Sequence, residues 1–203
     1  MQNKLNIGVR ASYPESGNVN WEEFLLSNKI PYIELAFYNP ENFKKISIDD
    51  VVAPIIEHPI GVLSIHMAHA KITKEREFIQ ILGKTIEIAR QLLVDTIVIH
   101  PSKSKSKPDN IYKFIEKEVD PIIKYYGVTV CWETFTSKYR FLSGPKEIAN
   151  FCKSHKNHKM CYDFSHVHKD TDQVLKDIDK DFSFIRIFHV SNLAEGKQHI
   201  PIY

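Results

Sequence analysis

Short runs of apolar residues alternate along the chain with longer segments in which apolar positions recur at helical spacing. A short apolar run bounded by turn residues is typical of a buried strand, whereas the helical period indicates a helix that buries one face. The runs predict strands at Leu5–Val9, Tyr32–Phe37, Gly61–Ala68, Thr96–Pro101, Val128–Phe135, Lys159–Phe164 and Phe184–Ser191.

The segments between these strands predict helices around Val19–Ser27, Ile48–Ile56, Thr73–Leu93, Pro108–Tyr126, from Pro145 onward, and around Thr171–Ile178. Thr73 is expected to be the N-cap of its helix, because its hydroxyl can accept a hydrogen bond from the first turn. Pro121 lies inside a predicted helix and should kink or split it. Pro145 suits the first turn of the helix that it opens.

The alternation of strand and helix predicts an α/β fold with a parallel sheet covered by helices, in a single domain spanning residues 1–203. A doubly wound sheet usually has a GxGxxG phosphate loop after its first strand, and GVRASYPESG (Gly8–Gly17) is not such a loop. A (β/α) barrel instead gathers its chemistry at the carboxyl ends of several strands. The sequence follows that second pattern and predicts a (β/α) TIM barrel.

Imidazoles and carboxylates stand at the ends of the third to seventh predicted strands, or just beyond them: His66, His100, Glu133, Asp163 with His166, and His189, followed by His199. Because side chains alternate along a strand, Glu133 and Cys131 should point into the barrel while Trp132 faces the helices. The same parity sends Asp163 and Cys161 inward.

Each of these residues alone has a structural explanation, as a hydrogen-bonded core histidine or as the partner in an ion pair. A converging set of imidazoles and carboxylates is unfavourable to bury unless each charge has a partner. A divalent cation would be that partner, and this ligand set suits zinc, manganese or iron better than calcium. The sequence therefore predicts a metal site at the mouth of the barrel.

The composition narrows the function further. A formal net charge of +2, with 43% hydrophobic and 26% charged residues, is ordinary for a globular protein and gives no broad field for nucleic acid. The lysines of KSKSK (Lys103–Lys107) form either a solvated loop or a phosphate contact. Three cysteines without a CxxC pair favour a reducing environment, and no apolar run approaches membrane-spanning length. We therefore expect a cytoplasmic protein that does not enter a membrane.

The ordered segments SIHMAH, IVIHPS, VCWETF, CYDFSH and IRIFHVSN resemble the xylose-isomerase-like TIM-barrel superfamily over nearly the whole chain. That superfamily includes sugar-phosphate isomerases and epimerases, and also the endonuclease IV family of abasic-site DNA nucleases. The resemblance implies that three residues are ligands of a central metal: Glu133, Asp163 and His189. In the endonuclease IV branch it further implies a second zinc at His66, His100 and Glu133, and a third at His166 and His199.

The chain also departs from the superfamily pattern. An eighth-strand glutamate is expected as the fourth ligand of the central metal, and the sequence HIPIY ends about where that strand should begin. Either the sequence is truncated, or a seven-strand barrel closes without the eighth unit, or another chain completes the site, for example in a homodimer. Lys197 stands where endonuclease IV has an aspartate ligand, and Arg10 where it has a histidine. We expect Arg10 to pair with Glu34.

The leading hypothesis is a divalent-metal-dependent isomerase or epimerase acting on a sugar or sugar phosphate. Glu133 would be both ligand and acid–base catalyst for proton abstraction next to a carbonyl. Lys103 or Lys105 would steer a phosphate, and Arg10 would contact the substrate. Two alternatives remain: an endonuclease IV-like abasic-site phosphodiesterase, with DNA as its partner, and a non-catalytic barrel remnant that binds metal or sugar.

Overall fold

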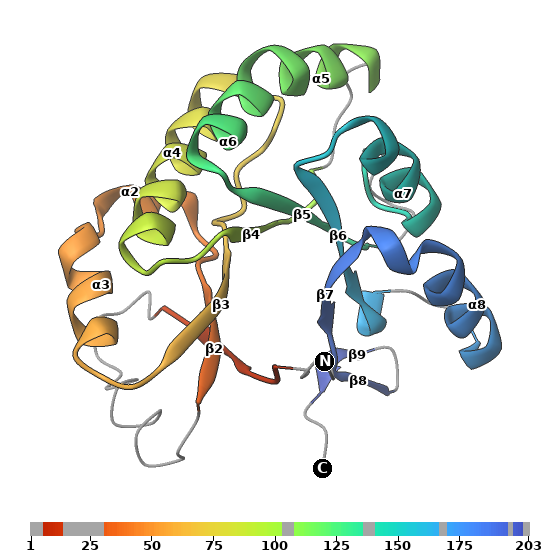
Figure 1. Cartoon of the computed structure of the whole chain (residues 1–203), viewed down its shortest axis with the longest axis horizontal. Coiled ribbons are helices and arrows are strands. Elements are labelled where there is room, and N and C mark those ends of the chain that lie inside the picture. Colours follow the sequence, from red (N-terminus) through yellow and green to blue (C-terminus); the bar gives the residue numbers. More distant parts are fainter. Residues whose placement is uncertain are drawn as a thin grey trace. The chain divides into compact units, whose positions relative to one another are not determined.

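The computed structural model describes residues 6–13, 31–102, 108–135, 141–166, 170–194 and 197–200. Seven strands follow one another in chain order across one sheet, and from β2 onward helices separate them in sequence (Figure 1). The chain divides into two compact units, unit 1 (Met1–Ala70 and Arg76–Ile97) and unit 2 (Lys71–Glu75 and Val98–Tyr203), with the division inside β4 (Thr96–Ile99). This alternation confirms the predicted α/β class.

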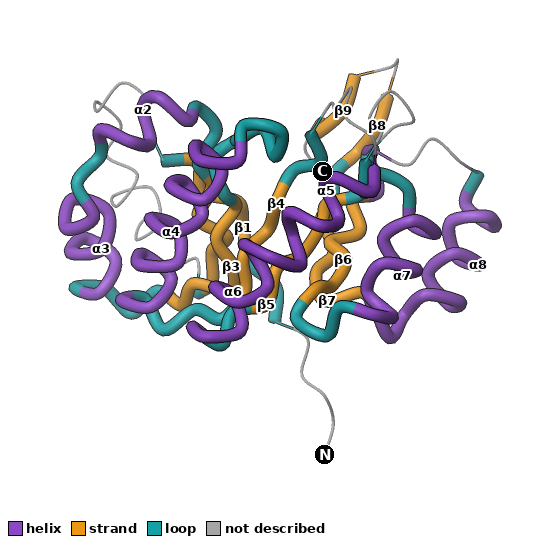
Figure 2. The backbone as a smooth tube through the Cα atoms, turned by 90° about the horizontal axis from the view of Figure 1, so that it is seen from above, coloured by secondary structure: helices purple, strands orange, loops and turns teal. Residues whose placement is uncertain are grey.

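Unit 1 contains three parallel strands, β1 (Val9–Ser12), β2 (Tyr32–Ala36) and β3 (Gly61–His66). Its helices are α2 (Pro40–Lys45), α3 (Ile48–Ile56) and α4 (Glu75–Gln91), and Figure 2 shows α3 and α4 on the same side of these strands. The strand register pairs Arg10 with Glu34, and Glu34 with Ser64. These three polar side chains therefore share one face of the sheet.

The short helix α2 was not predicted, although the local sequence favours it. The side-chain oxygen of Asn39 accepts hydrogen bonds from two backbone N–H groups of the first turn, at 2.9 and 3.2 Å, and Pro40 begins the helix. Near the other end, Nζ of Lys84 donates to three backbone carbonyls, which satisfies groups that a helix end leaves open. Burial lowers the pKa of Lys84 from its ordinary value.

Unit 2 contains β5 (Thr129–Glu133), β6 (His158–Asp163) and β7 (Ile185–His189), and β6 pairs in parallel with both neighbours. Between them lie α7 (Pro145–Ser154), the 3-10 turn η2 (Phe164–His166), α8 (Thr171–Asp181) and the 3-10 turn η3 (Phe182–Phe184). Figures 1 and 2 both show α7 and α8 side by side, outside β6 and β7.

Beyond β7, β8 (Asn192–Ala194) and β9 (Lys197–Ile200) form a separate antiparallel pair, which the sequence did not predict. Within the described residues no eighth parallel strand follows β7. The structure therefore agrees with the predicted series of seven parallel strands and adds a short hairpin where the seventh ends.

The helical segment before β5 is divided where the sequence predicted. The helix α5 (Pro108–Phe114) runs into a π-helical turn, η1 (Ile115–Val119), and α6 (Asp120–Tyr126) then begins with Pro121 in its first turn. Proline has no N–H and its ring crowds the carbonyl of the preceding turn. A π turn is wider than an α turn and accommodates that crowding.

The alternation along β5 and β6 places two sets of residues as predicted. Cys131 and Cys161 are fully buried in one cluster with Val98, and Ile187 packs against them. Trp132 points the other way, toward Phe151 of α7. The side chains on the inward face of unit 2 are therefore small and apolar along the strands. Polar side chains lie near the strand ends.

His158, the first residue of β6, is a buried histidine outside the strand-end set. It is only 1% exposed, and its Nδ1 accepts a hydrogen bond from the indole N–H of Trp132 at 2.9 Å. Its Nε2 lies 2.7 Å from Oδ1 of Asp120. Burial lowers the pKa of His158 from its ordinary value, against the opposing effect of Asp120.

Two further predictions were wrong in detail. β1 begins at Val9, where the first strand was expected to end. Thr73 lies in a turn two residues before α4 and is not its N-cap. The helix predicted around Val19–Ser27 lies outside the described residues.

Candidate metal centre

The carboxyl ends of β5, β6 and β7 each contribute one polar side chain to a cluster in unit 2. Glu133, Asp163 and His189 are the last residues of their strands, and the register pairs Asp163 directly with His189. Both carboxylates are fully buried. Parallel strands end at the same edge of a sheet, so the local alternation brings these three groups together.

Glu133 lies between imidazoles. Its Oε1 is 2.8 Å from Nδ1 of His189, and its Oε2 is 3.1 Å from Nε2 of His100, the residue that follows β4. Nδ1 of His166 lies 4.0 Å from Oε1. Each oxygen of this buried carboxylate therefore faces a different imidazole.

The two oxygens of Asp163 have different surroundings. Oδ1 accepts hydrogen bonds from the backbone N–H of Ser165 at 2.8 Å and from its hydroxyl at 2.7 Å. Oδ2 is buried and has no hydrogen bond within the described residues, with Nδ1 of His189 at 3.6 Å and Nδ1 of His166 at 3.7 Å. A buried carboxylate oxygen without a donor is unfavourable, so Oδ2 is where a cation would be stabilised most.

His166 is held in a defined orientation by the turn η2. Its Nδ1 lies 3.1 Å from the backbone carbonyl of Thr134, and its ring packs against Phe135 with ring centroids 4.0 Å apart. Because a carbonyl only accepts, this nitrogen carries the proton, and in the neutral ring Nε2 has the lone pair. This contact fixes the ring beside both carboxylates, whose oxygens lie 4.0 and 3.7 Å from Nδ1.

Among the described residues of unit 2, two groups of side chains have the composition and spacing to hold a metal ion. One is Glu133, Asp163 and His166, and the other is Glu133, Cys161 and His189, with one potential ligand atom from each residue within 4.8 Å of the others in its group. Carboxylate and imidazole ligands suit zinc, manganese or iron. The donor set and the buried Oδ2 of Asp163 fit a divalent cation at this position.

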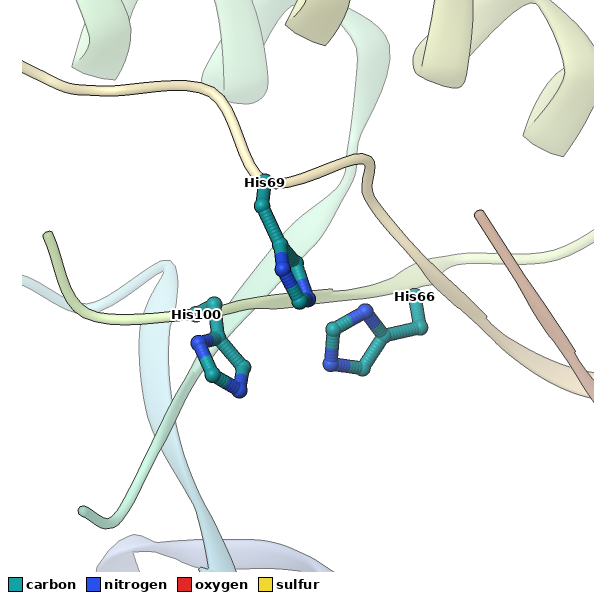
Figure 3. Close-up of side chains that lie close together, drawn as sticks. All are labelled: His66, His69 and His100. Atoms are coloured by element: carbon teal, nitrogen blue, oxygen red, sulfur yellow. The ribbon is translucent and has the colours of Figure 1, made fainter. Parts of the chain in front are cut away.

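His66 lies in unit 1, where it ends β3 fully buried. Its Nδ1 is 3.2 Å from the carbonyl of Met67, which leaves Nε2 of the neutral ring with the lone pair. The ring of His69 lies 5.7 Å away between centroids (Figure 3), and Tyr38 contacts both rings at 6.4 and 5.5 Å. A second zinc shared by His66, His100 and Glu133 stays a prediction.

Arg10 forms the ion pair expected of it. Its Nε lies 3.0 Å from Oε1 of Glu34, while the hydroxyl of Ser64 donates to Oε2 at 2.7 Å. The guanidinium also lies over the ring of Tyr38, 5.8 Å from its centroid. Glu34 is thus a structural partner of Arg10, and a contact of Arg10 with substrate stays a prediction.

Several other predicted site residues are not described. Lys103, Lys105 and Lys107 lie outside the described residues. His199 belongs to β9, but its side chain is outside the description. The phosphate contacts and the third zinc therefore stay predictions.

The structure adds three residues to the site that the sequence did not single out as functional. Ser165 and Thr134 hold Asp163, since the Asp163 N–H donates to the Thr134 hydroxyl at 2.8 Å. Cys161 lies with two of the expected ligands. A serine two residues after a strand-end aspartate is a recognisable turn signal, whereas the position of Cys161 depends on strand register.

A sequence model of the Xylose isomerase-like TIM barrel family matches residues 16–202, and the chain belongs to this family. This confirms the resemblance and the TIM-barrel fold class drawn from the strand-end motifs. Comparison with curated proteins found no match. Within the described residues, no helix has both the length and the apolar character needed to cross a membrane.

Solved structures of three proteins illustrate the range of this fold. The 3-keto-D-glucoside 4-epimerase YcjR from E. coli, in apo form, has 13% identity and a TM-score of 0.70, covering 92% of this chain and 80% of its own. Endonuclease IV from Thermus thermophilus has 14% identity and a TM-score of 0.66, covering 92% and 77%. The IolI protein with a bound zinc atom has 19% identity and a TM-score of 0.64, covering 94% and 76%. At these identities the likeness establishes the fold alone.

Proposed function

We propose that this chain is a divalent-metal-dependent isomerase or epimerase of a sugar or sugar phosphate, acting by proton abstraction next to a carbonyl. The observation that carries the proposal is the fully buried carboxylate of Glu133, which lies between His189 and His100 in the same cluster as the buried Oδ2 of Asp163. Two relatives support it by their names, a sugar epimerase and a zinc-bound protein of the same fold.

Glu133, Asp163, His166 and His189 would hold the cation, which when bound polarises the substrate carbonyl and stabilises the negative charge that develops on its oxygen. Asp163 contributes Oδ2, because Oδ1 is already occupied by Ser165. The buried position excludes water from both carboxylates, which strengthens their electrostatic interactions.

Glu133 is the base in this proposal. The C–H bond next to the carbonyl breaks, its electron pair stays on the substrate as an enediolate, and the proton moves to the Glu133 carboxylate. Isomerisation returns that proton to the neighbouring carbon, whereas epimerisation requires a proton on the opposite face of the same carbon. His189 and His100 lie 2.8 and 3.1 Å from the two oxygens of the carboxylate and orient it as the base.

The test is deuterium exchange in heavy water, followed by NMR at the carbon next to the carbonyl. The metal-loaded protein would be incubated with aldoses, ketoses and their phosphates. We expect exchange with at least one substrate, and its loss both with a chelator and in Glu133→Gln. Glu34→Gln is the matched control, a buried glutamate that pairs with Arg10 instead. Exchange that survives in Glu133→Gln, or that fails with every substrate, would contradict the proposal.

A second candidate is phosphodiester hydrolysis at abasic DNA, as the name of the endonuclease IV relative suggests. One observation favours it: the two oxygens of Glu133 face different imidazoles, His189 and His100, as expected of a carboxylate that bridges two cations. A chelator-sensitive nick in an abasic-site duplex, without exchange on any sugar, would select this candidate over the first.

A further inference from the structure

Cys161 occupies an unexpected level in the sheet of unit 2. It lies two residues before Asp163 in β6, so sequence spacing alone places it one layer below the site. The register between β5 and β6, however, pairs Glu133 with Cys161 and not with Asp163. The thiol therefore lies level with the end of β5.

This register brings the thiol to the expected ligands. Potential ligand atoms of Glu133, Cys161 and His189 all lie within 4.8 Å of one another. Cys161 is fully buried, and none of the three cysteines of the chain is in a disulfide. Cys131, equally buried in the same cluster and also two residues before a site carboxylate, belongs to no such group among the described residues.

We propose that Cys161 is a thiolate ligand of the divalent cation held by Glu133 and His189. This inference rests on the proposed metal-dependent function and extends it to the class of metal. As the sulfur–metal bond forms, the S–H bond breaks and its proton leaves to solvent. The thiolate adds a third negative charge to those of the buried Glu133 and Asp163 carboxylates, and a divalent cation offsets two of the three.

A thiolate changes which metals the site prefers. Oxygen and nitrogen ligands alone accept manganese or magnesium, whereas a sulfur ligand favours zinc and its spectroscopic substitute cobalt. With a thiolate ligand, zinc-like ions are therefore favoured among the metals that the sequence left open. The alternative is that Cys161 only fills the apolar cluster that it forms with Val98 and Cys131, and the experiment must separate that role from that of a metal ligand.

The experiment is titration of the metal-free full chain with Co²⁺, recorded from the near-ultraviolet to the visible. Bound cobalt gives d–d bands in the visible, and a cobalt–thiolate bond adds a charge-transfer band in the near-ultraviolet. We expect both in the wild type. Cys161→Ser should lose the charge-transfer band and keep d–d absorption, whereas Cys131→Ser should keep both.

Zinc affinity gives a second readout, measured by competition with a chelating dye. Cys161→Ser should weaken zinc binding by about 10- to 100-fold, a range that removal of even an outer-shell partner reaches. Manganese binding should change much less, and Cys131→Ser should leave both affinities unchanged. Cys161→Ala provides the same comparison if the buried serine hydroxyl prevents folding, with circular dichroism confirming the fold of each variant.

The outcomes separate this inference from the function on which it rests. A cobalt complex with d–d bands but no charge-transfer band, or a band that survives in Cys161→Ser, would overturn the thiolate ligand and leave the metal site standing. Absence of any cobalt absorption would overturn the metal site itself, and the thiolate ligand with it.

Discussion

Two buried glutamates, one in each unit, illustrate how partners decide what a carboxylate does. Glu34, on β2 of unit 1, is 8% exposed and pairs with the guanidinium of Arg10 at 3.0 Å. Glu133, at the end of β5 in unit 2, is fully buried and faces the imidazoles of His189 and His100. Arginine stays protonated at all physiological pH values, whereas an imidazole gains or loses its proton near neutrality.

The two glutamates therefore differ in whether their negative charge is already balanced by the protein. The charge of Glu34 is balanced permanently by its partner, so the pair is complete without a ligand. Glu133 and the neighbouring Asp163 bring two carboxylates into a buried cluster of neutral or titratable groups. A divalent cation or a substrate proton completes that balance. Burial of a carboxylate is therefore not enough to indicate a function, and its partners must be considered as well.

The largest expected effect is on catalysis. Glu133→Gln should reduce metal-dependent proton transfer by about 10²- to 10⁴-fold, the usual contribution of a positioned general base. Its free energy of unfolding should stay the same or increase, because the variant buries one charge fewer. Exchange rates and urea unfolding of the metal-free protein would be measured together. If Glu133→Gln lowered the free energy of unfolding enough to account for the lost activity, Glu133 would be a structural residue like Glu34.

Breaking the ion pair between Arg10 and Glu34 should lower the stability of the fold. Arg10→Met leaves Glu34 buried without its guanidinium and should lower the free energy of unfolding by about 3 kcal/mol, the lower part of the range for a broken buried pair. The lower part applies because the Arg10 side chain is 27% exposed. Urea denaturation would measure the loss.

The double variant Arg10→Met/Glu34→Gln tests the cause of that loss. Removal of both charges should restore most of the stability, since a neutral amide beside Ser64 remains satisfied by a hydrogen bond. If the double variant were as unstable as Arg10→Met, lost packing of the arginine side chain would explain the effect better than the unpaired charge.

A smaller effect is expected where the site depends on orientation. In Ser165→Ala, Asp163 loses the hydroxyl that holds Oδ1 at 2.7 Å, so its Oδ2 is less well fixed toward the cation. Metal affinity should fall about tenfold, the lower end for loss of an outer-shell partner. Isothermal titration with Zn²⁺ would measure the change. Ser165→Thr keeps the hydroxyl and should retain wild-type affinity, and a tenfold loss in this variant too would indicate a steric effect.

The smallest effect concerns a buried histidine outside the cluster. The pKa of His158 is lowered by burial below its ordinary value of 6.5, so the unfolded chain binds the proton first. The stability that neutral His158 contributes is complete above about pH 6.5 and declines as the pH falls, by at most about 1.4 kcal/mol per pH unit. Urea unfolding at several pH values would show this slope.

His158→Gln is the control for that slope. It removes the titrating group and should flatten the dependence of stability between about pH 6.5 and pH 5, above the range where most carboxylates protonate. An unchanged slope would mean that other groups cause it. A flattened slope would show that His158, which lies outside the candidate centre, contributes to the stability of the fold in its neutral form.

Much of the fold and part of the site could be predicted from local sequence. The helix break at Pro121 followed from the chemistry of proline, and the inward direction of Glu133 followed from alternation along β5. The hairpin of β8 and β9 could not be anticipated, because such short strands carry almost no pattern. β1 was misplaced for the same reason, since Val9 to Ser12 is short and mixed in character.

What the sequence could not supply was the register between strands. The pairing of Glu133 with Cys161 depends on how far β6 slides along β5, and a shift of one residue would turn every side chain to the other face. The burial of His158 likewise depends on the neighbouring strand, where the indole N–H of Trp132 donates a hydrogen bond to it. Both are tertiary facts, and composition at either position gives no sign of them.

The π turn η1, between α5 and α6, keeps the apolar residues of the helical segment on one buried side. Ile111, Ile115, Val119 and Ile123 are all buried, at steps of four residues. In an uninterrupted α-helix, four residues exceed one turn, so such a row would drift by about 40° at every step and soon leave the core. A π turn holds more residues per turn, and η1 covers the step from Ile115 to Val119. The π turn therefore rotates this row of apolar residues back toward the core. As a result Ile123, on α6, is still buried just before β5 begins.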